Sequence, residues 1–417
     1  MAKKGKYDWS TPPPVDSHTK VKHGIIHDYI KEYLLTLAKP RHATELKLSI
    51  FDCFCGGGLY LDLDGLNEHL GSPLQILSAV NNTEIEIQCQ DRPYNYNVNA
   101  QYVFSDDDES AIRALKSNLT NKGYVNIIGN CKVAKFADIV DELIASAKLQ
   151  SPRSERALFI LDQYGYTDAR ANEIVKIFNE LKNPEVLLFL STGKISDFLN
   201  KSMGFRAGLN NADILLPVDK LLRIRGQSRM LAEYQHECRK EILNSFQAQL
   251  GPIFMHPFSI KSSTDNREYW FAHITRHWTA REVMLGIHRR YANQSVLYGP
   301  NGLDLAMFGY AEDNDYSPHL IEESTVAVLD KNLPEHLMEN LSRFLRNNDL
   351  YGITVEELML RTANGNPGDK DIMARVYQMM MDNDITFHSA RGGSRQKGTA
   401  IELTDIIKHT GQKRFSL

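Results

Sequence analysis

Three successive glycines, Gly56 to Gly58, begin four residues after Asp52, which ends the mostly apolar run at 48–51. An apolar strand that ends in such a turn lets the backbone approach a ligand closely, because glycine has no Cβ atom to obstruct it. A dinucleotide fingerprint would need a further glycine at position 61, where Leu61 stands, and this argues against NAD or FAD. The alternative is an ordinary tight turn after a core strand.

The spacing of these residues, Asp52-x-Phe54-x-Gly56-x-Gly58, resembles the first nucleotide-binding motif of class I S-adenosylmethionine (SAM) methyltransferases. The resemblance implies a SAM cofactor whose aminoacyl part lies near Gly56 and Gly58, with Asp52 and Phe54 in the same cofactor-binding turn. In an open parallel sheet, ligands bind beyond the carboxyl ends of the strands, where the strand order reverses. Further cofactor contacts are therefore expected at the ends of other strands.

Two polar residues are candidates for those contacts. Asp106 follows the apolar stretch at 102–104, and a carboxylate there can accept hydrogen bonds from both ribose hydroxyls of SAM. Asn130, just past an expected strand at 125–128, either reads the adenine edge or is an exposed turn residue. Asp108 is expected to cap the helix that follows.

A second set of chemistry-bearing residues, Asp162-Gln163-Tyr164-Gly165, follows the apolar run at 157–161. Methyltransferases that act on nucleobase amines carry an Asp-Pro-Pro-Tyr type tetrapeptide at this place, and the resemblance implies that Asp162 and Tyr164 are catalytic. An exocyclic amine is a poor nucleophile, so a carboxylate holds its hydrogens while an aromatic ring stacks on the base. Gln163 and Gly165 depart from that pattern. The alternative is that Asp162 only shapes the cofactor site.

Other polar side chains near these motifs are expected to have structural roles. Lys20, Lys22 and His23 begin the first long helix and are expected to form its solvated end, with a phosphate or substrate contact as the alternative. His273 and His277 follow the last strand pattern of the same region, where a lone histidine is more often structural than catalytic.

The composition is that of a soluble globular protein with two or three domains. The chain has 417 residues, of which 42% are hydrophobic and 24% charged, and its net charge of −4 gives no global basic field. No apolar stretch approaches the ~18 residues of a membrane-spanning helix, and no secretory signal is present, so a cytoplasmic protein is expected. Five irregularly spaced cysteines predict neither a disulfide framework nor a metal site.

Strand patterns that alternate with helical patterns imply βαβ units, a parallel sheet and right-handed crossovers. We therefore predict an α/β protein with a Rossmann-like class I methyltransferase fold, a mostly parallel sheet, a helical insertion and a C-terminal winged-helix domain. The segment at 76–100 is expected to add a strand or hairpin, because Glu and Ile alternate in it. The other expected strands are at 47–54, 102–104, 125–128, 157–161, 185–190 and 269–274. Helices are expected at 18–38, 168–182 and 280–291. Two more helices are expected between them, one that begins with Ser72 as its N-cap and one that ends at residue 119.

Changes in composition divide the chain into four expected parts. An N-terminal arm and helix take residues 1–45, and the methyltransferase-like domain takes residues 46–292, with its helical insertion at 194–262. Residues 293–330 are rich in Asn, Gly, Asp and Pro and are expected to be a surface linker. The winged-helix domain takes residues 331–417.

The last part combines three helical patterns with two strand patterns, as a winged helix does. A winged helix commonly lays its third helix in the major groove and its hairpin against phosphates. Arg391, Arg395 and Lys397 lie among glycines in the expected hairpin turn and predict contacts with DNA or RNA phosphates. A protein-binding winged helix is the alternative, because the third helix ends in three methionines. The expected elements are helices at 333–346, 355–361 and 370–381, and strands at 385–389 and near 400–403.

An ordered set of motifs resembles the three-Cys-motif partner protein (TcmP) family. Members of that family resemble class I methyltransferases, occur in bacteria and their mobile elements, and are often encoded beside a protein with three characteristic cysteines. This chain lacks the cysteine motif itself, so the resemblance implies a methyltransferase-like fold and a protein partner encoded nearby. Besides the glycine turn, the motifs are Trp9-Ser10, His18-Thr19-x-x-Lys22-His23, Gly71-Ser72-Pro73, Asp162-x-Tyr164-Gly165, Thr275-Arg276-His277 and Glu282-Val283-Met284.

Together these features predict a SAM-dependent methyltransferase that acts on a nucleic-acid base amine, in a mobile-element or phage-defence context. A base inside a duplex is buried, so such an enzyme needs base flipping or a single-stranded target. One alternative is a catalytically silent SAM-fold subunit that binds nucleic acid or regulates a defence complex. Methylation of a small molecule is a second alternative.

Overall fold

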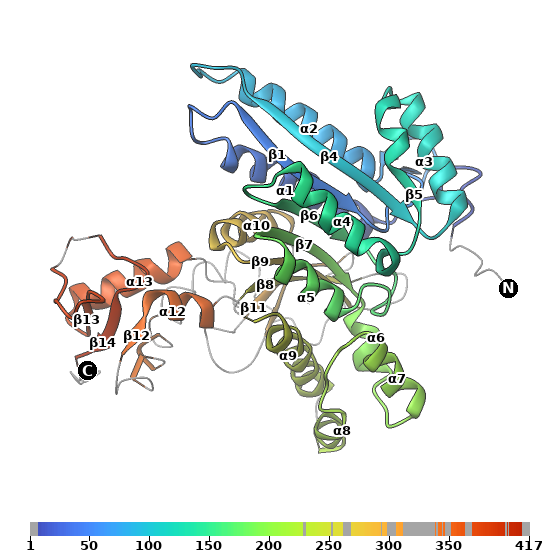
Figure 1. Cartoon of the computed structure of the whole chain (residues 1–417). Coiled ribbons are helices and arrows are strands. Elements are labelled where there is room, and N and C mark those ends of the chain that lie inside the picture. The colour runs from blue at the N-terminus through green and yellow to red at the C-terminus, as the bar shows by residue number, and fades with distance from the viewer. Residues whose placement is uncertain are drawn as a thin grey trace.

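A central sheet between two layers of helices dominates the protein (Figure 1). The computed structural model describes most of the chain and places its main sheet and helices. The described residues are 7–227, 231–251, 253–261, 268–292, 294–297, 306–311, 338, 341–343, 345–346, 352–362, 369–396, 398 and 400–410. Within them, nine strands form the main sheet, and two smaller sheets have two and three strands.

Five parallel strands form one half of the main sheet. In space they follow the order β5-β4-β1-β6-β7. If these five strands are numbered by their position along the chain, their order across the sheet is 3-2-1-4-5. This is the order of a doubly wound α/β sheet, whose switch point lies between its first and fourth strands. Here the switch point falls between β1 and β6. The bounds are β1 (Glu45–Asp52), β4 (Asn97–Asp106), β5 (Cys131–Val133), β6 (Arg156–Leu161) and β7 (Asn183–Leu190).

The other half of the sheet contains antiparallel pairs. Strand β9 lies between β7 and β8 and is antiparallel to both, and β11 and β10 extend the sheet beyond β8. Strand β8 falls within the expected helical insertion, and β10 and β11 fall within the expected linker, so these stretches contribute strands to the main sheet. The bounds are β8 (Phe254–Lys261), β9 (Glu268–Thr275), β10 (Gln294–Leu297) and β11 (Ala306–Ala311).

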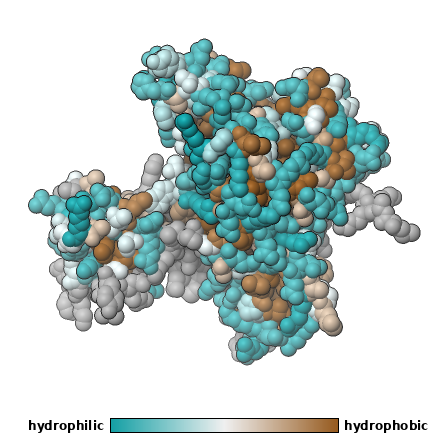
Figure 2. All heavy atoms as spheres, viewed as in Figure 1, coloured by the Kyte–Doolittle hydropathy of each residue, from teal (hydrophilic) through white to brown (hydrophobic). Residues whose placement is uncertain are grey.

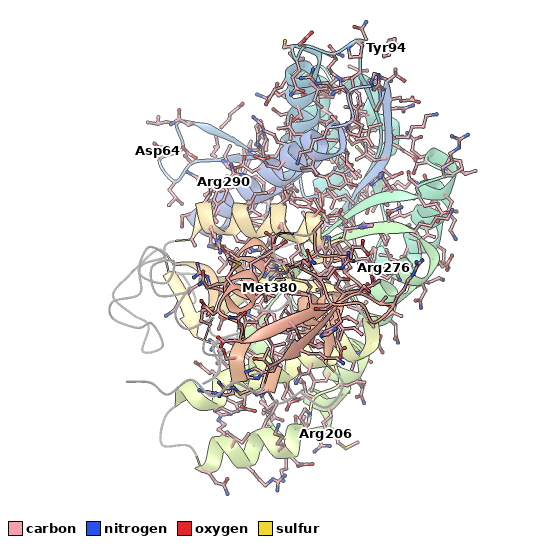
Figure 3. All side chains as sticks on the ribbon, turned by 90° about the vertical axis from the view of Figure 1, so that its left-hand side faces the viewer. Asp64, Tyr94, Arg206, Arg276, Arg290 and Met380 are labelled. Carbon is pink, nitrogen blue, oxygen red and sulfur yellow. The ribbon has the colours of Figure 1, made fainter. Side chains whose placement is uncertain are left out.

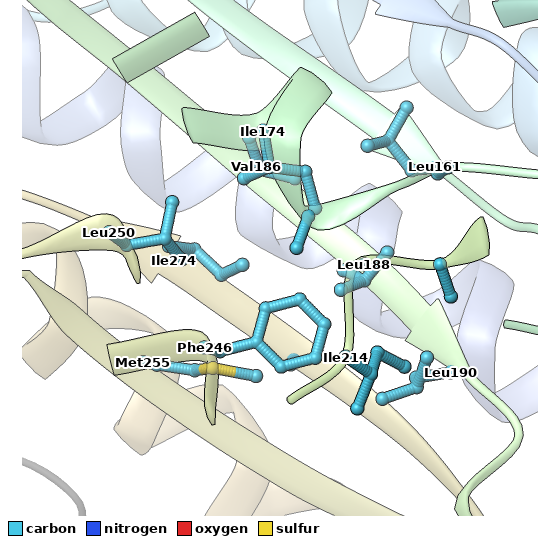
Figure 4. Close-up of a cluster of buried hydrophobic side chains, with 14 of the residues drawn as sticks. Leu161, Ile174, Val186, Leu188, Leu190, Ile214, Phe246, Leu250, Met255 and Ile274 are labelled. Carbon is cyan, nitrogen blue, oxygen red and sulfur yellow. The ribbon is translucent and has the colours of Figure 1, made fainter. Parts of the chain in front are cut away.

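Helices cover both faces of the sheet, because its central strands are apolar on both sides. In β7, Val186 and Leu188 belong to one apolar core, whereas Leu187 belongs to the other. Figure 4 shows the first core, where Phe246 of α9 lies near Met255 of β8. The first face carries α4 (Phe136–Gln150), α5 (Ala171–Glu180) and α9 (Leu231–Leu250), and the second carries α1 (Ser17–Leu37), α2 (Ser72–Gln88), α3 (Glu109–Asn121) and α10 (Trp278–Tyr291).

The helical insertion after β7 is present as expected, but it ends earlier than predicted. Four helices follow β7 and return the chain to β8 at Phe254. Figure 1 shows α7 and α8 extending away from the sheet. The bounds that have not yet been given are α6 (Thr192–Asp197), α7 (Met203–Asn211) and α8 (Val218–Gln227).

The N-terminal arm is held against a small hairpin that follows the glycine turn. The hairpin strands are β2 (Leu59–Leu61) and β3 (Glu68–Leu70), and Asp64 lies at the projecting tip between them (Figure 3). The arm pairs with β2 through a Val15 N–H that donates to the Leu61 carbonyl over 2.8 Å. The Leu61 N–H in turn donates to the Pro13 carbonyl over 2.9 Å. The arm is therefore ordered beside the expected cofactor site.

Helix α1 then packs against the sheet together with α10. Arg290 of α10, labelled in Figure 3, forms ion pairs with Asp28 and Glu32 of α1, and the two distances are 3.8 Å and 3.7 Å. On the buried side, Tyr29 and Ile30 belong to the core of the second sheet face. The first helix is thus part of the main body of the protein.

Two local predictions were wrong. The segment at 84–87 is not a strand but the end of α2, because Thr83 and Ile87, four residues apart, are buried while Ile85 is exposed. The segment at 125–128 is not a strand either: a 3₁₀-helix, η1, covers Val125–Asn130, and β5 follows it.

The cap of α2 also differs from the prediction. Gly71 stands at the N-cap, one residue before the expected Ser72, and Pro73 lies in the first turn. A proline is accommodated there because its missing N–H would have no helical partner.

The C-terminal region has a three-stranded sheet in the order β12-β14-β13 and two described helices. The strand that pairs with β13 is β14, which begins later in the chain than the predicted strand near 400–403. The reason is that Ile407 is the apolar residue that is buried opposite Phe387. Most of the helix predicted at 333–346 lies outside the described residues. The bounds are β12 (Ile353–Thr354), α12 (Val355–Thr362), α13 (Asp369–Met381), β13 (Ile385–His388) and β14 (Ile406–His409).

The surface is mixed in character. In the face seen in Figure 2, hydrophobic residues form separate small groups among hydrophilic ones. Among the described helices, none has the length and apolar character needed to cross a bilayer.

Candidate functional site

The carboxyl ends of the central parallel strands bring four predicted site residues to the switch point of the sheet. Asp52 ends β1, and the register of the sheet places it beside Phe104 of β4 and Ile160 of β6. Asp106 ends β4, and its Oδ2 accepts a hydrogen bond from the Gly56 N–H over 2.9 Å. Asp162 directly follows β6. We call Asp52, Gly56, Asp106 and Asp162 the switch-point site.

The glycine turn requires glycine at two of its positions. Gly56 and Gly58 have φ angles of 58° and 77°, in the left-handed region that disfavours other residues. At Gly58 a Cβ atom would also lie 2.6 Å from the Leu115 side chain of α3. The Asn118 side chain fixes the turn by donating to the Gly57 carbonyl over 2.8 Å.

Asp52 is fully buried, and its Oδ2 has no hydrogen-bond partner among the described residues. Burial raises the pKa of Asp52 to about 7, while interactions with the Ser72 side chain and the Phe54 N–H oppose the rise. The charges of Asp162 and Asp106 add to it, since three carboxylates lie near one another. The site therefore favours a bound cation close to Asp52.

Asp106 is oriented by two backbone groups. Besides Gly56, the N–H of Asp108 donates to Oδ1 of Asp106 over 3.0 Å. Burial raises the pKa of Asp106, and these two hydrogen bonds act in the opposite direction. Asp108 accepts from the Ser110 N–H over 2.8 Å, which confirms that it caps α3.

Asp162 forms an ion pair with Lys22 of α1, with 2.5 Å between Lys22 Nζ and Asp162 Oδ2. The two side chains are only 9% and 17% exposed, and Lys22 Nζ lies 4.4 Å from the centre of the Phe189 ring. The prediction of a solvated helix end at Lys22 and His23 was therefore wrong. Helix α1 already begins at Ser17, so these two residues lie on its second turn and face the sheet.

The loop after Asp162 is held in place by its own polar groups. Gln163 is buried, and its Oε1 accepts the N–H groups of Asp168 and Ala169 at 3.0 Å each. The Gly165 carbonyl accepts from the Ser191 N–H, which ties the loop to the end of β7. Gln163, which replaces proline in the resembled tetrapeptide, thus supports the loop by hydrogen bonds.

Tyr164 presents its ring at the surface, with 52% of the residue exposed. Its carbonyl accepts from Lys194 Nζ over 3.1 Å, and the same ammonium lies 5.9 Å from the ring centre. An exposed ring beside a cation suits base stacking next to a phosphate. The loop therefore places Asp162 inward and Tyr164 outward.

Three aromatic residues that were not predicted as site residues lie over the glycine turn. Tyr7, Trp9 and Tyr60 form an edge-to-face group, with ring centres 5.6 Å apart for Tyr7–Trp9 and Trp9–Tyr60. A Cβ on Gly57 would lie 2.3 Å from the Trp9 ring, which shows how closely the ring covers the turn. Burial raises the pKa of Tyr7 and Tyr60, and the charge of Asp162 contributes to both shifts. We call these three residues the aromatic cover.

The remaining predicted cofactor residues lie at the margin of the site. Phe54 is partly buried, packs against the core of the first sheet face and lies 6.5 Å from the Phe136 ring, measured between ring centres. Asn130 ends η1 immediately before β5. Its proposed contact with adenine stays a prediction, as does the role of Phe54.

The basic hairpin of the C-terminal region is only partly described. Arg391 is exposed, whereas Arg395 forms ion pairs with the buried Asp405 at 2.9 Å and with Glu402 at 3.2 Å. Lys397 lies outside the described residues. Arg395 thus has a structural contact within the hairpin, and the phosphate contacts of all three basic residues stay predictions.

The two histidines of the β9 region bond to other protein groups. His273 is buried and pairs with Glu185 over 2.9 Å, and His277 Nε2 lies 2.7 Å from Asn183 Oδ1. Both contacts agree with structural roles. Across the described part of the chain, no three His, Cys, Asp or Glu side chains are grouped as metal ligands.

Comparisons with known proteins add little to this geometry. No family model and no curated protein matches the chain. Among solved structures, it is similar to a putative rRNA methylase from Clostridium thermocellum, at 13% identity and a TM-score of 0.26, over 61% of this chain and 96% of the other. It is also similar to magnesium protoporphyrin IX methyltransferase from Synechocystis PCC 6803 with bound SAH, at 13% identity and a TM-score of 0.26, over 64% of this chain and 91% of the other. Scores this low carry no argument, so we base the function on the switch-point site.

Proposed function

We propose that this protein is a SAM-dependent methyltransferase that acts on an amine of a nucleic-acid base. The observation that carries the proposal is the switch-point site itself, where the glycine turn lies beside the buried Asp52 and the partly buried Asp106, and Asp162 is close enough to interact electrostatically with Asp52. The strand order supports a class I methyltransferase-like fold, because the position after the fifth parallel strand is taken by the antiparallel β9. A dinucleotide-binding sheet would have a sixth parallel strand there.

The residues of the site fit SAM. The left-handed Gly56 and Gly58 leave the backbone of the turn without side chains, as a closely bound ligand needs. The unpartnered Oδ2 of Asp52 suits the α-ammonium group of the cofactor, since a buried carboxylate is stabilised by a paired cation. Asp106 at the end of β4 suits the ribose hydroxyls, because each carboxylate oxygen accepts more than one hydrogen bond.

Bound SAM would supply an electrophilic methyl group, and the protein would orient the amine that receives it. Asp162 would accept a hydrogen bond from the amine N–H and so aim the nitrogen lone pair at the methyl group. The same carboxylate would accept the proton that the amine loses as the bond between nitrogen and methyl forms. Tyr164 would stack on the base from the exposed side of the loop. The aromatic cover would exclude water from the glycine turn.

The wider context of the proposal comes from the C-terminal region and from the TcmP resemblance. We propose that β12, α12, α13, β13 and β14 belong to a winged helix that presents DNA or RNA, with Arg391 at the tip of its hairpin. The resemblance favours a cytoplasmic protein of a mobile element or phage-defence system, with a partner encoded nearby. The target base must be flipped or single-stranded to reach Asp162.

Two measurements test the proposal. Calorimetry with SAM and with its demethylated product should show binding, and labelled methyl should pass from SAM to single- or double-stranded DNA or RNA. Asp162→Asn should abolish transfer while SAM still binds. Asp168→Asn is the matched control, because this exposed carboxylate lies on the same loop and contributes only its backbone N–H to Gln163. Failure of the wild-type protein to bind SAM would contradict the proposal.

The catalytically silent subunit is the second candidate, and the replacement of proline by Gln163 favours it. A silent subunit would bind SAM and nucleic acid but would transfer no methyl to any nucleic acid. A small-molecule methyltransferase, by contrast, would transfer methyl to small amines and would not respond to Arg391→Ala.

A further inference from the structure

The contact between Lys22 and Asp162 differs from the other ion pair made by the start of α1. Lys20, two residues earlier, pairs with Asp62 over 2.8 Å, and both of these side chains remain substantially exposed, at 40% and 28%. Lys22 pairs with Asp162 over 2.5 Å, and both are largely removed from water. One helix therefore offers a buried pair at the switch-point site and an exposed pair beside it.

The ammonium of Lys22 has two partners. It lies over the Phe189 ring of β7, 4.4 Å from the ring centre, a distance at which the face of the ring attracts a cation. It also binds Oδ2 of Asp162 and not Oδ1. Both partners are thus fixed by rigid elements, Lys22 by α1 and Asp162 by the end of β6.

Asp162 lies among other acidic groups. Asp52 and the hydroxyls of Tyr7 and Tyr60 lie close enough to interact electrostatically with Asp162. Next to Lys22 on α1, the buried His23 bonds to His69, with 2.9 Å between His23 Nδ1 and His69 Nε2. Burial together with the Lys22 charge lowers the pKa of the His23 imidazole, which keeps it neutral. Lys22 is therefore the cation that this part of α1 pairs with Asp162.

We propose that Lys22 is a positioning residue for methyl transfer: it binds Oδ2 of Asp162 and so turns the other oxygen toward the amine of the substrate. This inference rests on the proposed function for the identity of the reaction. It adds to that function by making α1 part of the site, since the cation that pairs with Asp162 comes from this helix. A phosphate contact is the competing role for Lys22, but a phosphate would have to displace Asp162 from a buried ammonium.

A double-mutant cycle of unfolding measures the pair without any assumption about the reaction. The variants are Lys22→Met, Asp162→Asn and their combination, with Lys20→Met, Asp62→Asn and their combination as the matched exposed pair. The buried pair should show a coupling of more than about ten-fold in the unfolding equilibrium, against less than about five-fold for the exposed pair. Equal couplings for the two pairs would overturn the proposal.

Steady-state kinetics then separate positioning from simple support of the fold. Methyl transfer to bulk DNA or RNA should have a lower kcat in Lys22→Met than in the wild type, whereas the KM for SAM should stay unchanged, because Lys22 contacts Asp162. Lys22→Arg should restore kcat in part, because it restores the cation. An unchanged kcat in Lys22→Met would overturn the role of Lys22.

The two proposals fail in different ways. If the wild-type protein transfers no methyl group but the coupling behaves as expected, the proposed reaction is wrong and the buried Lys22–Asp162 pair is retained. If transfer occurs and Lys22→Met has the wild-type kcat, the reaction is retained and the positioning role is wrong.

Discussion

SAM binding should depend on pH through Asp52. Burial raises the pKa of this carboxyl group from 3.8 to about 7, so Asp52 holds a proton in the unliganded protein below that pH. The α-ammonium of SAM favours the charged carboxylate and should displace the proton. Affinity should therefore rise with pH up to about 7, and the proton should be released on binding. At roughly pH 7.7 half of the cofactor's amine has itself lost its proton, which sets the upper limit of the test.

The size of the effect follows from one titrating group. With a pKa of about 7, Asp52 is half ionised at pH 7 and about one-eleventh ionised at pH 6. SAM should therefore bind about five-fold more weakly at pH 6 than at pH 7, and roughly 0.9 proton should be released per SAM at pH 6. In Asp52→Asn, which cannot ionise, both the pH dependence and the proton release should disappear.

Isothermal titration calorimetry with SAM measures both quantities, if each pH is examined in two buffers of different ionisation enthalpy. Asp107→Asn is the matched control, because Asp107 is an exposed carboxylate next to Asp106. It should keep the wild-type pH dependence. If Asp52→Asn binds SAM with the same pH dependence and proton release as the wild type, the assignment of Asp52 to the ammonium is refuted.

Three further predictions concern the core, the aromatic cover and the basic hairpin. Burial lowers the pKa of both His256 and His288 well below 6.5, so acidification below about pH 6.5 should destabilise the protein by about 1.4 kcal/mol per pH unit for each of them, as urea unfolding would show. Gly57→Ala should cost about 1–3 kcal/mol of stability and change tryptophan fluorescence, since its Cβ would lie 2.3 Å from the Trp9 ring. Arg391→Ala should lower the salt dependence of nucleic-acid binding by about one unit of slope, because one phosphate contact is lost.

Each of these predictions has a clear control. For the histidines, the double variant His256→Leu/His288→Leu should lose the additional acid sensitivity, and retention of the full sensitivity would show that other groups cause it. For the glycine turn, Gly129→Ala is suitable, because a Cβ there would meet nothing within 4 Å. For the hairpin, Arg391→Lys keeps the charge and should retain the slope. An unchanged slope in Arg391→Ala would argue for a protein-binding role of this region.

The features that the sequence predicted well are local in the chain. The glycine turn, the strands that lead to Asp52, Asp106 and Asp162, and the cap at Asp108 were expected close to where the structure has them, although β4 begins at Asn97, earlier than predicted. A glycine turn depends on backbone conformation at two nearby positions, and a buried strand shows itself as a short apolar run. The general α/β architecture follows from the alternation of such runs with helical patterns.

The incorrect predictions arose where a local pattern has two interpretations. Glu and Ile alternate at 84–87 as in a strand, but only Ile87 is buried there, four residues after the buried Thr83, which is the spacing of a helix face. The polar stretch that holds β10 and β11 has the composition of a loop. Its strands form because the open edge of β8 accepts β11 as a partner.

The amino-acid sequence by itself determined the glycine turn, the order of the elements and the carboxylates at the strand ends, since these depend on neighbouring residues. Only the tertiary structure decided that Lys22 is buried against Asp162 and that Trp9 covers Gly57. Lys22 and Asp162 are far apart in the chain, and nothing near either residue indicates its partner. Their contact exists because the sheet places the end of β6 beneath the start of α1, and burial then makes each charge depend on the other.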